Sequence, residues 1–316
     1  MNLRRALLIA FFVFIVASLF SFAGVAERAG ANGVTPQQRT VVFAVFGASG
    51  QLSARMEPIL LLEGGQYKEP VSGGSDGEEI KRFSTEHYKP GRKYRLLFGG
   101  AEAGTATIKK STGDEECFRT GADITLQTDA RLNRNVMALA TDSSSLGQAA
   151  AERSRRTPTT LERTQAIELA RSTFKQKGVA AALLPAVEVV NLTAVDLDRD
   201  GKFELVGSFV ASKRTRRQER YVLFMLAVPD GAGYRAAVSN YSKFGEADIM
   251  SGSTITTINE GTYVEKLVEH LDLDGDRTSE LVTIAEGLEG VTYYVYKRQG
   301  GAWNKVYEFG NYRCAF

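Results

Sequence analysis

Two short acidic stretches hold the residues whose spacing points most directly to chemistry. Each stretch places a carboxylate at loop positions 1, 3, 5 and 9: Asp196, Asp198, Asp200 and Glu204 in the first, and Asp272, Asp274, Asp276 and Glu280 in the second. Carboxylates at alternate positions do not share a helix face, and on one strand face they repel one another. A divalent cation removes this repulsion, and Ca²⁺ prefers oxygen ligands of this kind, so we predict a structural calcium loop in each stretch.

The ligand set that we expect is that of a loop between β-strands. Lys202 stands at position 7 of the first loop and Thr278 at position 7 of the second, where a backbone carbonyl would bind the ion. Gly201 at position 6 permits a sharp turn. An EF-hand does not fit, because its loop needs a bidentate Glu at position 12 and flanking helices. Position 12 is Gly207 in the first loop and Thr283 in the second, and the flanking segments have strand patterns.

The second loop differs at position 6, where Arg277 replaces the glycine and Gly275 stands two positions earlier. A left-handed backbone at Arg277 costs about 1 kcal/mol, so we expect the second calcium site to be the weaker one. The alternative for both loops is an acidic, solvated turn that binds no metal, since Asp and Gly are also common turn residues.

The chain around the loops has a mostly β pattern. Residues 40–140 contain short β-branched and aromatic runs, two of which end in paired glycines, and this predicts a small all-β domain. Residues 141–160 are polar and predict a linker. For residues 161–316 we expect one helix followed by a repeated antiparallel β-meander.

The helix is predicted from its cap and its apolar stripe. Thr159 and Glu162 have the spacing of a capping box. The spacing of one helix face also separates four apolar residues, Ala166, Ile167, Ala170 and Phe174. Gly178 follows as the stop signal. The stripe predicts a core face of the second domain.

An internal repeat relates the two acidic stretches, since Asp196 and Asp272 are 76 residues apart. Each half consists of a strand, an acidic loop and three further strands, and each ends in a Phe-Gly pair. This pattern resembles the FG-GAP/VCBS-type repeat of integrin-like propellers and many secreted bacterial proteins. The resemblance covers roughly residues 187–316 and implies that the acids of both loops bind calcium and stiffen the module. Two copies do not close a propeller, and no Gly-Ala-Pro segment accompanies the Phe-Gly pairs.

The N-terminus predicts export. Arg4 and Arg5 precede a long apolar run that ends in small residues, which indicates a signal peptide over residues 1–26, with an uncleaved membrane anchor as the alternative. Residues 27–39 follow as a polar linker. We therefore expect a periplasmic, extracellular or cell-surface protein. Cys117 and Cys314 permit one disulfide in such an oxidising compartment, and two buried thiols are the alternative.

The charge of the chain argues against nucleic acid as a partner. The net charge is +2, whereas phosphate binding needs a concentrated basic face. One basic hairpin, with Lys213, Arg214, Arg216, Arg217 and Arg220, offers a docking point for an anionic surface or an assembly partner. A solvated hairpin tip is the simpler interpretation of this hairpin.

The remaining candidate motifs do not point to an enzyme. The stretch VVFAVFGASGQL begins like a dinucleotide-binding turn but has Ser53 at the third glycine position. His87, expected in a loop, and His270 accompany no recognisable nucleophile motif. An aromatic hairpin, with Tyr293, Tyr294, Tyr296 and Trp303, offers a stacking surface for sugar, but its alternation favours a strand core.

These observations predict an exported, non-enzymatic binding or scaffolding protein with structural calcium loops and a protein or polysaccharide partner. The alternative function is a secreted hydrolase that acts on polysaccharide through a carboxylate pair outside the loops.

Overall fold

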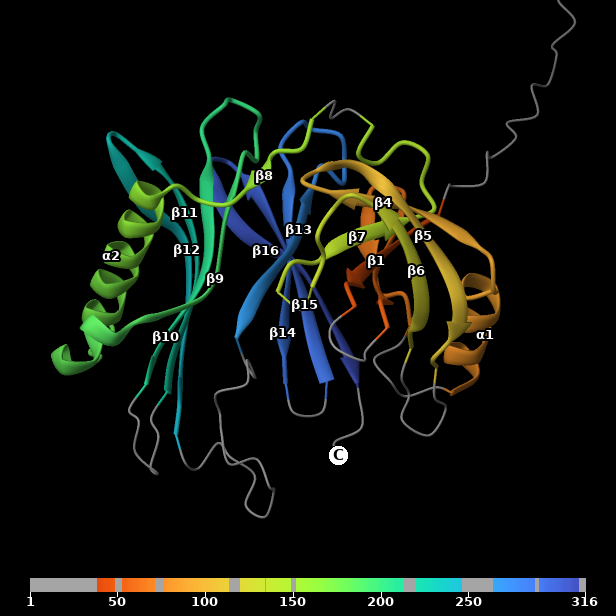
Figure 1. The fold of residues 1–316 in the computed structure, drawn as a ribbon, viewed down its shortest axis with the longest axis horizontal. Coiled ribbons are helices and arrows are strands. Elements are labelled where there is room, and N and C mark those ends of the chain that lie inside the picture. Colours follow the sequence, from red (N-terminus) through yellow and green to blue (C-terminus); the bar gives the residue numbers. More distant parts are fainter. Residues whose placement is uncertain are drawn as a thin grey trace, which may run out of the picture. The chain divides into compact units, whose positions relative to one another are not determined.

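The computed structural model describes residues 39–48, 53–71, 77–113, 120–133, 135–148, 152–212, 220–245, 264–287 and 290–312. The fold is mostly β and consists of three antiparallel sheets with few helices (Figure 1), which confirms the predicted fold class. No helix in these ranges is long and apolar enough to cross a membrane. The predicted signal peptide or anchor, nearly all of the linker 27–39, and both cysteines lie outside the described residues.

The first sheet closes on itself. Its strands are β1 (Thr40–Phe46), β2 (Arg55–Glu63), β3 (Gln66–Lys68), β4 (Lys93–Phe98), β5 (Ala101–Ser111), β6 (Ala122–Thr128) and β7 (Ala138–Thr141). They follow the order β1-β7-β4-β5-β6-β2-β3, and β1 also pairs with β2. Six strands therefore form a closed antiparallel barrel, and β3 extends β2 beyond it. Because β1 pairs antiparallel with the next strand, the dinucleotide-binding interpretation of this segment fails.

One helix interrupts the predicted all-β region. Helix α1 (Gly77–His87) buries Ile80, Phe83 and His87, which are three and four residues apart and so share one helix face. The rings of Phe83 and His87 pack against Phe43 of β1, with centroids 6.3 and 6.1 Å from it. The prediction that residues 40–140 contain no helix, with His87 in a loop, was wrong. The stripe is short, and its third member is a histidine rather than an aliphatic residue.

Two meanders make up the rest of the fold. The first consists of β9 (Glu188–Val195), β10 (Glu204–Ser212), β11 (Arg220–Asp230) and β12 (Gly233–Phe244), with the short β8 (Arg155–Arg156) beside β9. The second consists of β13 (Glu265–Leu271), β14 (Glu280–Glu286), β15 (Gly290–Gln299) and β16 (Ala302–Tyr312). The predicted order of strand, acidic loop and three strands is present in both.

Helix α2 (Thr160–Gln176) covers the first meander and forms as its sequence predicts. The Thr159 side chain accepts a hydrogen bond from the Glu162 amide at 3.3 Å, and the Glu162 carboxylate accepts one from the Thr159 amide at 2.7 Å. Ala166, Ala170 and Phe174 are fully buried against β10 and β11. A 3-10 helix, η1 (Ala181–Ala186), follows after Gly178.

Shared hydrophobic cores hold the sheets together. One core joins the barrel to β13–β16, and a second, which includes Leu197 and Leu281, joins the two meanders. The layers therefore succeed one another as α2, first meander, second meander and barrel, with α1 on the barrel (Figure 1). Both acidic loops connect the first two strands of their meanders.

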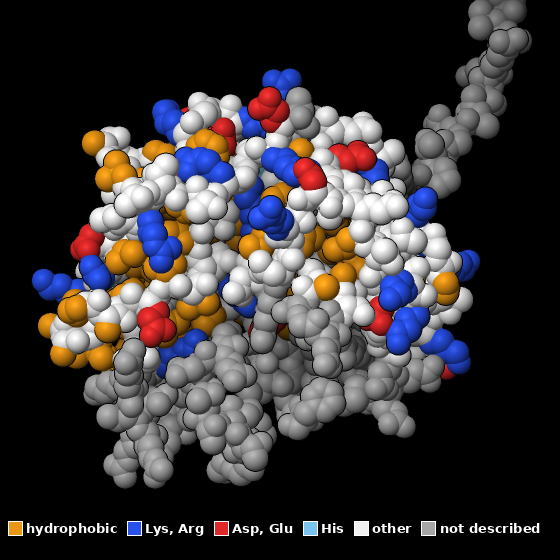
Figure 2. Space-filling view, viewed as in Figure 1, with side chains coloured by type: hydrophobic (Ala, Val, Ile, Leu, Met, Phe, Trp, Pro, Cys, Tyr) orange, Lys and Arg blue, Asp and Glu red, His pale blue; other side chains and the backbone are white. Residues whose placement is uncertain are grey.

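Charged side chains of both signs share the described part of the face shown in Figure 2. On the face shown in Figure 2, Lys and Arg side chains are dispersed, with Asp and Glu side chains between them. Most of the basic hairpin, residues 213–219, lies outside the described residues. Arg220 at its base is only 3% exposed, so this arginine is not part of a solvated tip.

Candidate metal centre

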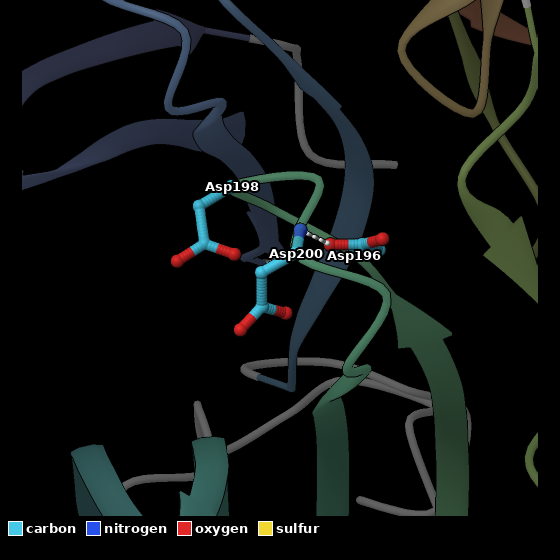
Figure 3. A group of neighbouring side chains, drawn as sticks. All are labelled: Asp196, Asp198 and Asp200. Carbon is cyan, nitrogen blue, oxygen red and sulfur yellow. Dashed lines mark hydrogen bonds between the residues drawn. The ribbon is translucent and has the colours of Figure 1, made fainter.

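The first acidic loop lies between β9 and β10. Asp196 follows the last residue of β9, and Glu204 is the first residue of β10. Carboxylate oxygens of Asp196, Asp198 and Asp200 lie within 4.8 Å of one another. Figure 3 shows the Asp198 and Asp200 carboxylates pointing to the same side, while the Asp200 amide is directed at Asp196. The loop therefore brings together the three aspartates that the sequence selects.

Backbone amides fix the carboxylates at both ends of this loop. Asp196 accepts hydrogen bonds from the amides of Asp200 and Gly201, each at 3.1 Å. Glu204 accepts one from the Leu197 amide at 3.0 Å. The amide of Lys202, the predicted position-7 residue, donates to Asp200 Oδ1 at 2.8 Å. These amide bonds occupy both oxygens of Asp196 and one oxygen each of Asp200 and Glu204, and an ionised carboxylate oxygen that accepts one hydrogen bond keeps a second lone pair for a cation.

Glu204 is the most strongly perturbed acid of this loop. Burial raises its pKa to about 7, the Leu197 amide opposes this rise, and the negative charges of Asp198 and Asp196 add to it. Burial penalises the charged form of a carboxyl, and a cation beside it favours that form. A proton and a cation bound in this loop would therefore compete for Glu204.

A cavity of about 290 Å³ opens beside the loop. Asp198, Asp200 and Glu204 line it together with Val228 and Trp303, and so do the basic residues Lys202, Arg235 and Arg298. Asp198 Oδ1 is buried and accepts no hydrogen bond from the described residues, although its Oδ2 accepts one from Arg298 at 3.1 Å. This oxygen is a buried acceptor that a bound cation would satisfy.

Two cations touch the first loop at its rim. Arg298 on β15 pairs with Asp198, and Lys202 pairs with Asp200 at 3.0 Å. Both side chains are largely exposed, and each pairs with one aspartate. Exposed pairs of this kind contribute about 0–1 kcal/mol, so they compensate the charge of the loop weakly.

The second loop repeats most of the backbone pattern of the first, although its first aspartate accepts the amides of positions 4 and 6 rather than 5 and 6. Oxygens of Asp272, Asp274 and Asp276 lie within 4.8 Å of one another. Asp272 accepts hydrogen bonds from the amides of Gly275 at 2.7 Å and Arg277 at 3.0 Å. The amide of Thr278 donates to Asp276 at 2.8 Å, as that of Lys202 does to Asp200.

Glu280 closes the second loop as Glu204 closes the first. It accepts a hydrogen bond from the Leu273 amide at 2.8 Å. Burial raises its pKa to about 7. The two loops are therefore built alike in backbone and in acids, and they contact each other where the Ser279 amide donates to the Leu197 carbonyl at 2.7 Å.

The second loop also holds a residue that the sequence analysis missed. Lys297 on β15 pairs through its Nζ with Asp274, with Asp276 at 2.9 Å and with Glu280 at 3.1 Å. Burial alone would lower the pKa of Lys297, but the hydrogen bonds to these three carboxylates outweigh burial and raise its pKa well above the usual value. Lys297 lies 17 residues beyond Glu280, so only the pairing of β14 with β15 brings it to the loop.

Backbone strain does not distinguish the two loops. The predicted left-handed conformation at Arg277 is present, with φ +73°, and Gly275 has φ +83°. In the first loop, however, Arg199 has φ +59° at the position equivalent to Gly275, and Gly201 has φ +82°. Each loop therefore places one glycine and one arginine in this region, and the reason given for a weaker second site applies equally to the first.

The other candidate residues serve the packing of the fold. Burial, with help from the Arg155 charge, lowers the pKa of His270 to about 3, and the side chain is fully buried with no opening to a substrate. Tyr293 and Tyr296 of the aromatic hairpin are buried, which agrees with the preferred strand-core interpretation. Trp303 is half-buried beside the cavity of the first loop. Comparison with family models, with curated proteins and with solved structures finds no match.

Proposed function

We propose that this chain is an exported, non-enzymatic binding or scaffolding protein whose first acidic loop holds a structural Ca²⁺ ion. The observation that carries the proposal is the convergence of Asp196, Asp198 and Asp200 beside the buried Glu204. The resemblance to FG-GAP/VCBS-type repeats supports the choice of metal and the exported location. Calcium is a hard cation that prefers oxygen ligands, and these carboxylates supply such ligands.

In this proposal the ion stabilises the fold rather than performing a reaction. The loop connects β9 to β10, whose buried faces form the core under α2 and the core between the meanders. An ion that binds only the native state stabilises it by about 2.7 kcal/mol when its concentration is a hundred times its Kd. The module would then present its strands and hairpins as a rigid binding surface.

The hydrolase alternative has less support from the described residues. Outside the loops, burial raises the pKa of Glu265 and of Glu269. Glu265 accepts hydrogen bonds from Thr283, Tyr296 and Asn240, and Glu269 pairs with Arg155. Both carboxylates are buried and connect strands to one another, so neither is presented to a polysaccharide.

A thermal melt of the full chain in EDTA and in millimolar calcium tests the calcium site. We expect a calcium-dependent rise in the unfolding midpoint that disappears in Asp198→Asn, which keeps the side-chain shape and removes the charge. Asp274→Asn is the matched control at the same position of the second loop, and we expect it to keep the calcium response. The same unfolding midpoint in EDTA and in calcium for the parent protein would contradict the proposal.

A further inference from the structure

We propose that Lys297 is a tethered cation that takes the place of a metal ion in the second loop. Its Nζ contacts the acids at positions 3, 5 and 9, which are Asp274, Asp276 and Glu280. An ammonium group offers three donors and one positive charge, which suits three converging carboxylates. Lys297 therefore offsets part of the negative charge of the second loop from within the chain, and the loop takes up no calcium.

The burial of this cluster separates it from an ordinary surface pair. The Lys297 side chain is 16% exposed, and the Glu280 side chain is fully buried. Arg298, the next residue along β15, is 45% exposed and pairs with a single aspartate of the first loop. A network of one cation and three acids in a partly buried site holds its geometry better than isolated exposed pairs.

Strand register identifies the residue that replaces Lys297 in the first repeat. Leu281 of β14 lies opposite Tyr296, and Leu205, its equivalent 76 residues earlier, lies opposite Ala227. The residue after Ala227 is Val228, so Val228 corresponds to Lys297. Val228 lines the cavity beside Asp198, Asp200 and Glu204. An uncharged side chain thus stands in the first repeat where the second repeat supplies an ammonium group.

The two loops consequently meet the same repulsion in different ways. The second carries its own cation on a neighbouring strand, and the first has a cavity beside its acids at the equivalent place. The inference about Lys297 does not require the first loop to bind calcium. Only its corollary, that the chain takes up one calcium ion rather than two, rests on the proposed function.

Calcium uptake by the full chain, measured by equilibrium dialysis and elemental analysis, tests this inference together with melts in EDTA and in millimolar calcium. In Lys297→Met we expect a midpoint several degrees lower in EDTA, recovery in calcium, and one more bound calcium than in the parent. Lys305→Met is the matched control, since Lys305 lies on β16 of the same sheet in an exposed pair with Glu308. This control should change neither uptake nor the calcium response.

Two further variants keep the test decisive if Lys297→Met does not fold. Asp274→Asn in the otherwise native chain should leave calcium uptake unchanged, and a loss of one bound calcium would overturn the inference. Val228→Lys should supply the first loop with an ammonium group and remove the calcium response of the melt. Equal destabilisation of Lys297→Met with and without calcium would also overturn it. If the parent binds no calcium but Lys297→Met binds one, the inference stands and the proposed function fails.

Discussion

Replacement of Arg155 by leucine tests how the barrel is joined to the second meander. Arg155 on β8 and Glu269 on β13 form a salt bridge of 3.0 Å, with side chains 4% and 0% exposed. The same guanidinium nitrogen donates to the carbonyls of Met137 at 3.1 Å and Val268 at 3.0 Å. Glu269 also accepts the Gly99 amide at 3.0 Å, so this one pair connects β8 and β13 to the barrel.

The magnitude follows from what the substitution leaves behind. Arg155→Leu leaves the buried carboxylate of Glu269 without its positively charged partner. It also removes a hydrogen-bond donor from the carbonyls of Met137 and Val268. Breaking a buried pair by removal of one partner costs about 3–5 kcal/mol, which is a large part of the roughly 5–15 kcal/mol that stabilises a typical protein. We expect a loss of about 4 kcal/mol in the free energy of unfolding, measured by urea titration.

The pH dependence supplies a second, independent readout. Burial raises the pKa of Glu269, and the Arg155 charge opposes that rise. Without Arg155 the pKa rises further. A raised folded-state pKa means that the folded state binds the proton more tightly than the unfolded state, so this contribution to stability is fully present below the unfolded-state pKa and is lost as the pH rises through the folded-state pKa. The loss in the free energy of unfolding caused by Arg155→Leu should therefore be smaller at about pH 5 than at about pH 8.

The control for this prediction is Arg153→Leu. Arg153 pairs with Asp129, whose side chain is 77% exposed, and such pairs contribute about 0–1 kcal/mol. The double variant Arg155→Leu with Glu269→Leu should recover much of the lost stability, because it leaves no unpaired buried charge. A cost of Arg155→Leu as small as that of Arg153→Leu, or a cost that does not change with pH, would refute the reasoning.

Two further expectations concern the metal and the export signal. Calcium affinity should weaken as the pH falls below about 7, because burial raises the pKa of Glu204 to about 7 and its protonated form does not bind the ion. Calorimetry in buffers of different ionisation enthalpy should show proton release when calcium binds. The Glu204→Gln variant should show no such release. In a bacterial host, the full chain should appear outside the cytoplasm with a mature N-terminus near Glu27 by mass spectrometry, and an unprocessed, membrane-bound form would indicate the anchor instead.

Much of the fold could be predicted because the local signals agree with the tertiary contacts. The segment ADITLQT alternates in the strand period and forms β6 over the same residues. The capping box of Thr159 begins α2 where it is predicted. Barrel closure could not be predicted, because it needs the pairing of β1 with β7, which joins residues about a hundred positions apart. No local spacing encodes such a pairing.

The same distinction applies to the candidate site: residues close together in the chain could be predicted, and residues brought together by strand pairing could not. Positions 1, 3, 5 and 9 of each loop were readable, since Asp196 and Glu204 are close in the chain and their amide partners lie within the same loop. The strain at Arg199 was missed because Gly201 suggested that one glycine satisfied the whole turn. Lys297 was missed because it reaches its acids across the β14–β15 pairing.

The comparison of the loops shows why an acidic motif alone does not determine what neutralises it. Both loops have acids at the same positions, the same amide hydrogen bond to the closing glutamate and one arginine each with positive φ. They differ in the cations that contact them: one position of the neighbouring strand holds Val228 in the first repeat and Lys297 in the second, and the first loop has instead exposed pairs with Lys202 and Arg298. A lysine at that position brings an ammonium group to the carboxylates without the loss of freedom that a bound ion suffers. The choice between metal and lysine therefore depends on a residue outside the motif, and a single substitution in either direction should exchange the two solutions.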